Sequence, residues 1–295
     1  MKYTLPFTIP STDMDDHLRF TTLAMITAVQ EVTSVHYASG GLSIPHLQRQ
    51  GITWVLVKQR FEISEYPLWM DEVLLSTWAK QAKGPFFLRD FSFSFNKNGK
   101  KATLDQAFRD FQVKKEGFCK EEGSISAVEK EAAFSKPFLK GTSAWMVLDA
   151  KSLKPIRPSE NVMGTLEMGT EDALPSQFSK IPLAEDLGKK WDCVQEIEPT
   201  VLDIDVNDHV NNLSYIRWIL SYLPKTFYKG MLIESIDTYF MSSALFNQRL
   251  LVRSSECEDG KLLHSIIRKD DGTDVFRAES RWKKAELLSR QACIE

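Results

Sequence analysis

Hydrophobic and polar residues follow the same succession of patterns in the two halves of this chain. Each half opens with a β-type segment, continues with apolar residues at the spacing of an amphipathic helix, and ends in several runs typical of β-strands. The predicted helices span residues 23–38, ended by Gly40 and Gly41, and residues 214–223, ended by Pro224. A repeated order of this kind indicates an internal duplication.

The β-type runs have counterparts in both halves. They cover residues 2–9, 52–67, 71–81, 86–100 and 142–150 in the first half, and 192–202, 231–243, 248–260, 261–273 and 274–285 in the second. The segments "NKNGK" and "KDDGT" predict hairpin turns of the Asn-Gly and Asp-Gly kind. One helix followed by antiparallel strands is the order of a hotdog fold. We therefore expect an α+β protein with tandem hotdog folds in one chain, each a long helix wrapped by an antiparallel sheet.

A linker and an insertion interrupt the duplication. The segment between the halves is rich in Pro, Gly, Ser and charge, so we expect an N-terminal unit at 1–158, a linker at 159–190 and a C-terminal unit at 191–295. The first half carries an insertion near 102–140, where the second half needs only a hairpin. This insertion is either a tolerated surface loop or a lid or partner-docking element.

A polar stretch, "DVNDHVNN" (205–212), precedes the second helix. The asparagines at its end can cap that helix, but a cap does not account for Asp205, Asn207 and His209. In an extended segment these three side chains would lie on one side. An imidazole can take a proton from water, a carboxylate can orient it, and backbone N–H groups at a helix start can hold an oxyanion. The residues alone leave both a helix cap and an acyl-transfer site open.

The first half carries a partial copy of this stretch. Placing "DMDDHLRFTTL" under "DVNDHVNNLSY" aligns Asp13 with Asp205 and His17 with His209. In this alignment Arg19 and the phenylalanine after it replace the paired asparagines. We therefore expect the first copy to be a capped turn and not a second catalytic site.

Composition and charge exclude some classes of function. Hydrophobic residues make up 43% and charged residues 26% of the 295 residues, as in soluble globular proteins, and a net charge of −3 lacks the basic excess typical of nucleic-acid binding. No run approaches the ~20 apolar residues of a membrane span, and the N-terminus has no signal-peptide pattern, so we expect a cytoplasmic protein. The four scattered cysteines are expected to be free thiols: Cys119, Cys193, Cys257 and Cys293.

The polar stretch and the "LSYIRW" that follows it resemble the D-x-N-x-H-V-N-N-x-x-Y-x-x-W signature of plant and bacterial acyl-acyl-carrier-protein (acyl-ACP) thioesterases. Three further stretches look like the same family, in the expected order: "LQRQGITWVLVKQRFEISEYPLWMDEVLLSTW", "LRDFSF" and "GTSAWMVLDAKSLKPIRP". The resemblance implies that the N-terminal unit holds the acyl chain and that the C-terminal unit supplies catalysis. Carried over, the catalytic candidates are Asp205, Asn207 and His209.

The chain departs from the plant pattern in one place. The plant enzymes have a Glu-Cys pair after a tyrosine in the next strand, and Ser242 and Ser243 stand at those positions here. We therefore expect direct hydrolysis, with His209 and Asp205 sharing the activation of water and Asn207 positioning the water or the thioester carbonyl. A serine nucleophile at 242 or 243 is the alternative. The candidates for substrate binding are Trp54, Asn211, Ser242 and Ser243.

The implied reaction is hydrolysis of fatty acyl-ACP to a free fatty acid and the carrier protein, which ends chain elongation. An acyl-CoA thioesterase and a non-catalytic acyl-ligand-binding hotdog protein are the alternatives. We expect no cofactor or metal, since His36, His46 and His264 have no partner at metal-ligand spacing. The expected partner is an acyl carrier protein, and the chain itself is expected as a monomer or homodimer. Lysines that could provide a basic landing area for the carrier are Lys80, Lys83, Lys97, Lys100, Lys101, Lys114 and Lys115.

Overall fold

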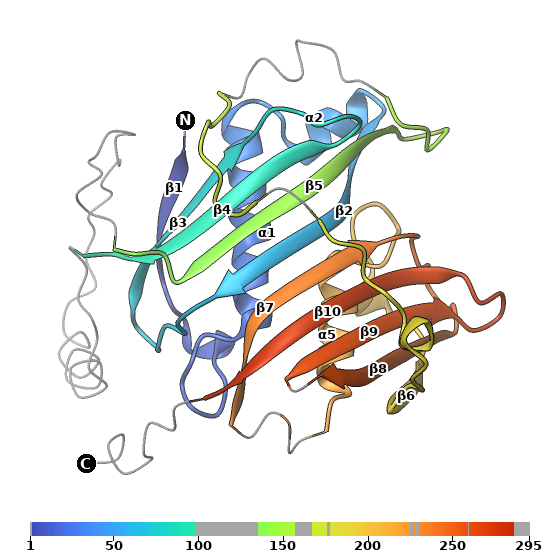
Figure 1. The fold of residues 1–295 in the computed structure, drawn as a ribbon. Coiled ribbons are helices and arrows are strands. Elements are labelled where there is room, and N and C mark those ends of the chain that lie inside the picture. Colours follow the sequence, from blue (N-terminus) through green and yellow to red (C-terminus); the bar gives the residue numbers. More distant parts are fainter. Residues whose placement is uncertain are drawn as a thin grey trace.

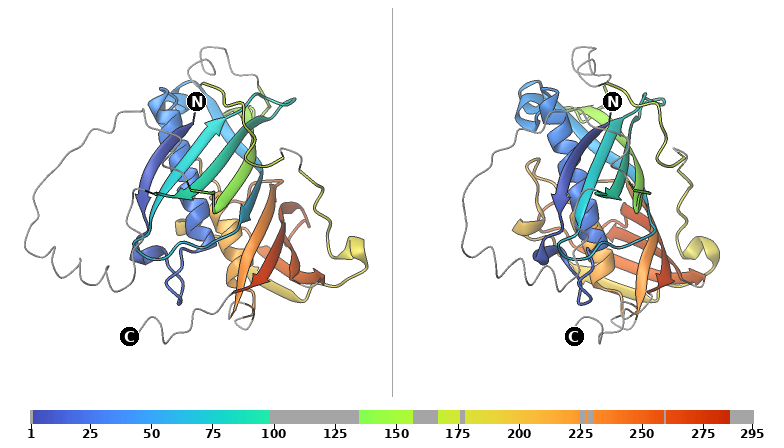
Figure 2. Two further views of the ribbon diagram at one scale, coloured as in Figure 1. Left: turned by 60° about the vertical axis from the view of Figure 1, so that its left-hand side comes forward. Right: turned by 90° about the vertical axis from the view of Figure 1, so that its left-hand side faces the viewer.

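A single antiparallel sheet curves around two helices in this protein (Figure 1; Figure 2). The computed structural model describes residues 2–97, 135–156, 167–175, 178–224, 227, 230–258 and 260–285. The strands are β1 (Tyr3–Thr8), β2 (Ile52–Ile63), β3 (Glu72–Ala79), β4 (Phe87–Phe95), β5 (Leu139–Asp149), β6 (Cys193–Ile197), β7 (Met231–Phe240), β8 (Leu250–Glu258), β9 (Lys261–Arg268) and β10 (Asp274–Lys284). The helices are α1 (Thr22–Ser39), α2 (Ile44–Arg49) and α5 (Asn212–Ser221), and short 3-10 turns lie at η1 (Ser11–Asp13), η4 (Glu185–Leu187) and η5 (Val201–Asp203).

The strand order shows the duplication directly. The sheet runs β1-β3-β4-β5-β2-β7-β10-β9-β8-β6, so each half, read from its outer edge inwards, has its first, third, fourth, fifth and second strand. The halves join where β2 and β7 pair antiparallel. The register repeats as well, because Leu56 lies opposite Trp145 in the first unit and Ile233 lies opposite Trp282 in the second. The predicted tandem hotdog fold is confirmed.

The two units share one hydrophobic core. Ile26 and Val29 of α1 and Ile216 and Ile219 of α5 are almost completely buried in the same cluster of side chains. Burying each such side chain stabilises the fold by about 1.5–3 kcal/mol. The helices lie against each other inside the curved sheet (Figure 1), and the shared core fixes the start of each helix against the other unit.

The structure adds one element and leaves part of the predicted organisation untested. The helix α2 was not predicted, because its six residues are too few to show a helical period. The "KDDGT" turn joins β9 to β10 with Gly272 at φ 69°. The insertion near 102–140 follows β4, and its residues up to 134 lie outside the described part of the chain, as does most of "NKNGK".

The linker is described only in part. Residues 167–175 run against β3, where the Trp78 indole N–H donates to the Glu171 carbonyl (2.9 Å). Gly169 packs on this indole so closely that a Cβ would lie 2.2 Å from a ring carbon. The predicted boundaries at residues 158 and 191 stay predictions. None of the helices in the described ranges is long and apolar enough to cross a membrane.

Candidate active site

The polar stretch before α5 forms a tight turn. A bridge between Ile204 and Val210 closes the turn, the Asp205 N–H donates to the His209 carbonyl (2.8 Å), and Asp208 adopts a left-handed φ of 62°. Asp205 Oδ1 accepts the backbone N–H groups of Asn207 (2.8 Å) and His209 (3.4 Å). The stretch is therefore a turn and not an extended segment, because the carboxylate accepts two backbone donors and folds the chain around itself.

The predicted catalytic residues are gathered on this turn without being bonded to one another through their side chains. Within the described residues, the side chains of Asn207 and His209 have no hydrogen-bond partner, and Asp205 Oδ2 is equally unused. Asn207 is exposed, while Asp205 and His209 are half-buried. An imidazole, an amide and one carboxylate oxygen are thus free to meet a substrate or a water molecule at the start of α5.

The cap of α5 determines where the turn ends. Asn211 Oδ1 accepts the Leu213 N–H (2.9 Å), and the Asn211 N–H donates to the Asp203 carbonyl (2.7 Å). Asp203 is buried and forms an ion pair with Arg217. Although burial alone would raise the pKa of Asp203, hydrogen bonds from Thr200 and the charge of Arg217 lower it overall. Asn211 therefore has a structural role, and its contact with substrate stays a prediction.

The loop after β7 lies directly beside the turn. The Val210 N–H donates to the Ala244 carbonyl (3.0 Å), and the Ala244 N–H donates to the Tyr215 hydroxyl (2.9 Å). Burial, and after it the negative charge of Asp205, raises the pKa of Tyr215 to about 12. Because this hydroxyl stays protonated at neutral pH, it can still donate one hydrogen bond of its own.

Arg268 is a site residue that the sequence analysis missed. Its Nη2 donates to Ser242 Oγ (2.9 Å) from the end of β9, and its charge acts on Tyr215. Ser243 is exposed. The only signal in the sequence was the position of Arg268 just before the "KDDGT" hairpin, which does not reveal that β9 ends beside the loop after β7.

The first unit contains the same turn at residues 15–19, so it starts two residues after Asp13, where the sequence alignment had placed it. The Asp15 N–H donates to the Arg19 carbonyl (2.9 Å), Leu18 has a left-handed φ of 59°, and Asp15 Oδ1 accepts the N–H groups of His17 (2.8 Å) and Arg19 (3.0 Å). Thr21 then caps α1 through the Ala24 N–H (3.2 Å). The contacts of Asp15 and Leu18 repeat those of the second turn, and Thr21 takes the place of Asn211 as the helix cap.

The structural equivalence corrects the predicted alignment. Asp15 takes the place of Asp205, and Arg19 takes the place of His209; the predicted pairing of Asp13 and His17 with these residues is wrong. Several aspartates match by letter, but only the one that captures two backbone N–H groups defines the turn. Arg19 Nε forms an ion pair with Asp15 Oδ2 (2.8 Å), and a guanidinium does not act as a base in proteins. The first turn is a capped turn with a guanidinium at the position of His209, and its lack of catalysis stays a prediction.

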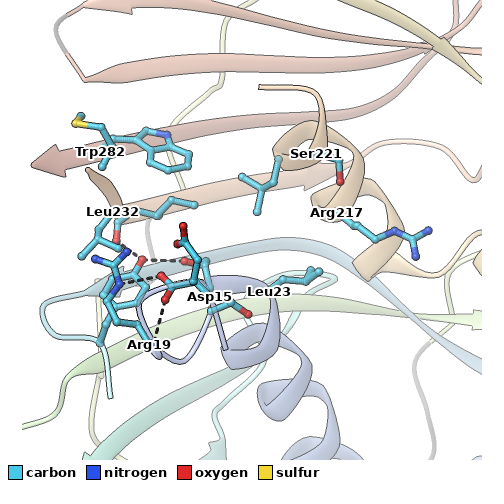
Figure 3. Close-up of a pocket in the computed structure, with 14 residues that line it drawn as sticks. Asp15, Arg19, Leu23, Arg217, Ser221, Leu232 and Trp282 are labelled. Atoms are coloured by element: carbon cyan, nitrogen blue, oxygen red, sulfur yellow. Dashed lines mark hydrogen bonds and ion pairs between the residues drawn. The ribbon is translucent and has the colours of Figure 1, made fainter. Parts of the chain in front are cut away.

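A cavity of about 290 Å³ lies beside the first turn (Figure 3). The turn and the start of α1 form one side, and the end of α5 with β7 and β10 forms the other. Leu23, Leu232 and Trp282 point into it, with Arg19 and Ser221 at its polar edges (Figure 3). The cavity is bounded by both units.

Trp54 occupies, beside the turn 205–209, the position that a cavity residue occupies beside the turn 15–19. Since Leu56 pairs with Trp145 as Ile233 pairs with Trp282, Trp54 takes the place of Met231, which lines the cavity. The Trp54 ring lies 5.4 Å from Tyr37 and 5.2 Å from Phe87, measured between centroids. Its role in substrate binding stays a prediction.

The predicted landing area for the carrier loses one lysine. Lys80 is almost completely buried, with Nζ 3.2 Å from the Asp90 carboxylate and in contact with Asp172. Its inclusion is wrong, because the linker folds over this end of β3 and its aspartate neutralises the ammonium group. Lys83 and Lys97 are exposed; Lys100, Lys101, Lys114 and Lys115 lie outside the described residues.

The isolated histidines serve structural contacts. The ring of His264 is bonded to Ser254 and Ser280 (2.8 Å each), and burial lowers its pKa to about 3. His36 Nδ1 lies 3.0 Å from Arg89 Nη1, and burial, together with the charge of Arg89, lowers its pKa to about 4. No group of three or more His, Cys, Asp or Glu in the described ranges is arranged to hold a metal ion.

Comparison with known proteins places the chain in one family. The N-terminal domain model of the acyl-ACP thioesterases matches residues 1–113, and the C-terminal domain model matches residues 188–284; together they cover more than two thirds of the chain. The palmitoyl-acyl carrier protein thioesterase of Gossypium hirsutum is 22% identical over 283 residues, which cover 90% of this chain and 60% of the relative. The oleoyl-acyl carrier protein thioesterase 1 of Arabidopsis thaliana is 20% identical, covering 96% of this chain and 76% of that protein.

Solved structures show the same fold. The 12:0-ACP thioesterase from Umbellularia californica has a TM-score of 0.75 at 18% identity, covering 96% of this chain and 97% of that one. An acyl-ACP thioesterase from Bacteroides thetaiotaomicron has a TM-score of 0.70, also at 18% identity, covering 96% and 98%. The chain spans about 60% of the length of the first curated relatives that it matches. On the family models that match both halves, the chain belongs to the acyl-ACP thioesterase family.

Proposed function

We propose that this protein hydrolyses fatty acyl-ACP to a free fatty acid and the carrier protein, with the turn 205–209 as its catalytic site. The observation that supports this most strongly is the imidazole of His209 beside Asn207 and Asp205, on a turn that opens a helix, with no hydrogen-bond partner for the ring in the described part of the chain. The named relatives act on acyl-ACP, which supports the choice of substrate class.

The geometry favours direct attack by water. His209 accepts a proton from water as the oxygen bonds to the thioester carbon, and the carbonyl becomes an oxyanion. N–H groups of the first turn of α5 lie at the positive end of the helix and suit that charge. The C–S bond then breaks, and the proton on His209 passes to the thiolate sulfur. Asn207 can hold the water or the carbonyl through its free amide.

Asp205 has two separable tasks in this scheme. Its Oδ1 holds the turn through two backbone N–H groups, so it fixes the position of His209. Its unused Oδ2 is the oxygen that can face the imidazole and stabilise the charged form. Ser242 accepts from Arg268, which cannot serve as a base, so the contacts favour water over this serine as nucleophile.

Trp54 and the carrier belong to the same proposal. In the repeat, Trp54 is equivalent to Met231, which lines the cavity beside the first turn. This supports Trp54 as part of the wall that contacts the acyl chain beside the turn 205–209. Acyl carrier protein is the proposed partner, with Lys83 and Lys97 as exposed basic residues that could meet it. We also infer a cytoplasmic location, which the free thiols of Cys193 and Cys257 support.

A substrate comparison tests the proposal. The purified full chain is assayed for release of free acid from acyl-ACP and acyl-CoA with the same acyl chain, over a series of chain lengths. We expect hydrolysis of acyl-ACP with a higher kcat/KM than that of acyl-CoA. Equal or better use of acyl-CoA would favour the CoA alternative, and binding of both without hydrolysis would favour the non-catalytic alternative.

A further inference from the structure

The cavity beside the turn 15–19 is the counterpart, in the first unit, of the space beside the candidate catalytic turn. The two turns share their backbone hydrogen bonds, their left-handed residue and their helix cap. We propose that this cavity is a second acyl site, which binds a free fatty acid and does not cleave a thioester. The identity of the ligand as the reaction product rests on the proposed function.

The walls of the cavity suit an alkyl chain. Leu23 of α1, Leu220 of α5, Leu232 of β7 and Trp282 of β10 line it, and Figure 3 shows Leu23, Leu232 and Trp282 around the same space. Trp282 is held by a hydrogen bond from its indole N–H to Ser280 Oγ (2.7 Å). Apolar walls with polar groups at one edge are typical of sites for small amphipathic molecules.

Arg19 provides the group that recognises a carboxylate. Its side chain is only 10% exposed and lines the cavity. Within the described residues its contact with the Asp15 carboxylate uses Nε alone, which leaves the two terminal nitrogens of the guanidinium for a ligand. Two parallel N–H groups match the two oxygens of a carboxylate. The position that carries a proton acceptor in the second unit thus carries an anion-binding group in the first.

Of the other charged groups at the cavity, Asp15 and Arg217 are engaged by partners of opposite charge, and Asp16 faces the solvent. Both oxygens of Asp15 are used, Oδ1 by two backbone N–H groups and Oδ2 by Arg19. Asp16 is largely exposed and lies 3.7 Å from the His17 ring. Arg217 also lines the cavity, and its guanidinium is paired with the Asp203 carboxylate. The Tyr66 hydroxyl donates to the Ile233 carbonyl (2.8 Å). Arg19 is therefore the cation that remains for the headgroup.

Calorimetric titration of the full chain with dodecanoate, below its micelle concentration, tests the second site. We expect two equivalents bound by the wild type, one at each turn. Arg19→Gln removes the charge and should weaken one of the two sites by about tenfold or more. Ser221→Trp fills the cavity from the end of α5 without touching the ion pair and should leave one equivalent.

The controls separate this site from the catalytic one. Tyr222→Trp changes the neighbouring exposed residue outside the cavity lining and should keep two equivalents. One equivalent in the wild type, or two in Ser221→Trp, would overturn the second site. Because binding of the free acid needs no catalysis, absence of thioester hydrolysis would refute the proposed function and leave the binding result to stand or fall by itself.

Discussion

The turns 15–19 and 205–209 have the same backbone and different chemistry. In both, an aspartate captures two backbone N–H groups, the fourth residue is left-handed, and the residue that caps the following helix lies two positions after the fifth. The fifth residue is an arginine bound to its own aspartate in the first turn and, in the second, a histidine whose ring has no hydrogen-bond partner among the described residues. The fold thus supplies one scaffold twice, and the side chains at two or three positions decide whether it can move a proton.

Replacing the second turn by the sequence of the first should have the largest effect, and it tests whether the backbone supplies the scaffold and the side chains supply the chemistry. Replacing 205–209 by the sequence of the first turn requires Val206→Asp, Asn207→His, Asp208→Leu and His209→Arg. We expect the folded state to lose no more than about 1 kcal/mol, because the first unit shows that this sequence fits the same backbone. Hydrolysis of acyl-ACP should fall by about 10³-fold or more, since the imidazole then lies at position 207 and position 209 carries a guanidinium, which does not act as a base. An active graft would show that the chemistry lies elsewhere.

Two substitutions of Asp205 separate the scaffold from the chemistry. Asp205→Ala removes the acceptor for two backbone N–H groups, so we expect a loss of about 1–2 kcal/mol in unfolding free energy and a fall in kcat of about 10²-fold or more. Asp205→Asn keeps an oxygen at Oδ1, so stability should be nearly retained while kcat still falls. Full activity in Asp205→Asn, measured beside its thermal midpoint, would limit the carboxylate to holding the turn.

The buried histidines of the two units should both make stability depend on pH, and that of the second unit more strongly. The pKa of His264 falls to about 3 in the folded state from an ordinary value near 6.5, and the pKa of His36 in the first unit falls to about 4. At a pH between the folded and the unfolded pKa of His264, the unfolded chain therefore binds a proton that the folded chain does not. His264 should lower the unfolding free energy by up to ~1.4 kcal/mol for each pH unit below about 6.5.

Chemical denaturation between pH 4.5 and 7 measures this slope. His264→Gln should flatten it by about the contribution of one proton, and His36, which is also neutral when folded, accounts for part of what remains. An unchanged slope in His264→Gln would contradict the assignment of a neutral, buried imidazole.

The helix caps should show the smallest effect and the closest agreement between the units. Thr21→Ala and Asn211→Ala each remove one side-chain acceptor from a helix start, and each should cost about 1 kcal/mol. Thermal midpoints of the two variants should fall together. A loss of stability in only one of them, or a large loss of activity in Asn211→Ala at unchanged KM, would show that the starts of the two helices differ in more than their side chains.

Periodicity in the sequence was sufficient for the strands and the two long helices but not for the alignment of the two halves, and it missed the short helix α2. The strands and both long helices follow from alternating and helical spacing of apolar residues, and Gly272 and Pro224 mark a turn and a helix end through their own backbone preferences. The repeat was misaligned by two residues, because Asp13 and Asp15 are indistinguishable until one of them captures backbone donors. The turn at 205–209 takes the place of the extended geometry considered for this stretch, because Asp205 accepts two backbone N–H groups.

Contacts between distant segments could not be read from the chain. Arg268 reaches Ser242 only because β9 ends beside the loop after β7, and Lys80 is buried only because the linker returns over β3. The cavity beside the first turn is bounded by segments from both units, so no local pattern announces it. The sequence therefore identified the residues of the second turn and missed the groups that surround it.

The central claim is that His209 moves the proton in thioester hydrolysis and that the turn 15–19 of the first unit, which carries Arg19 at the equivalent position, does not. The most direct measurement is the rate of free-acid release from one acyl-ACP by the wild type, His209→Ala and the matched control His17→Ala. We predict a fall of about 10²–10⁴-fold for His209→Ala and less than a twofold change for His17→Ala, with all three proteins folded. Wild-type activity in His209→Ala, or an equal loss in both variants, would contradict the account.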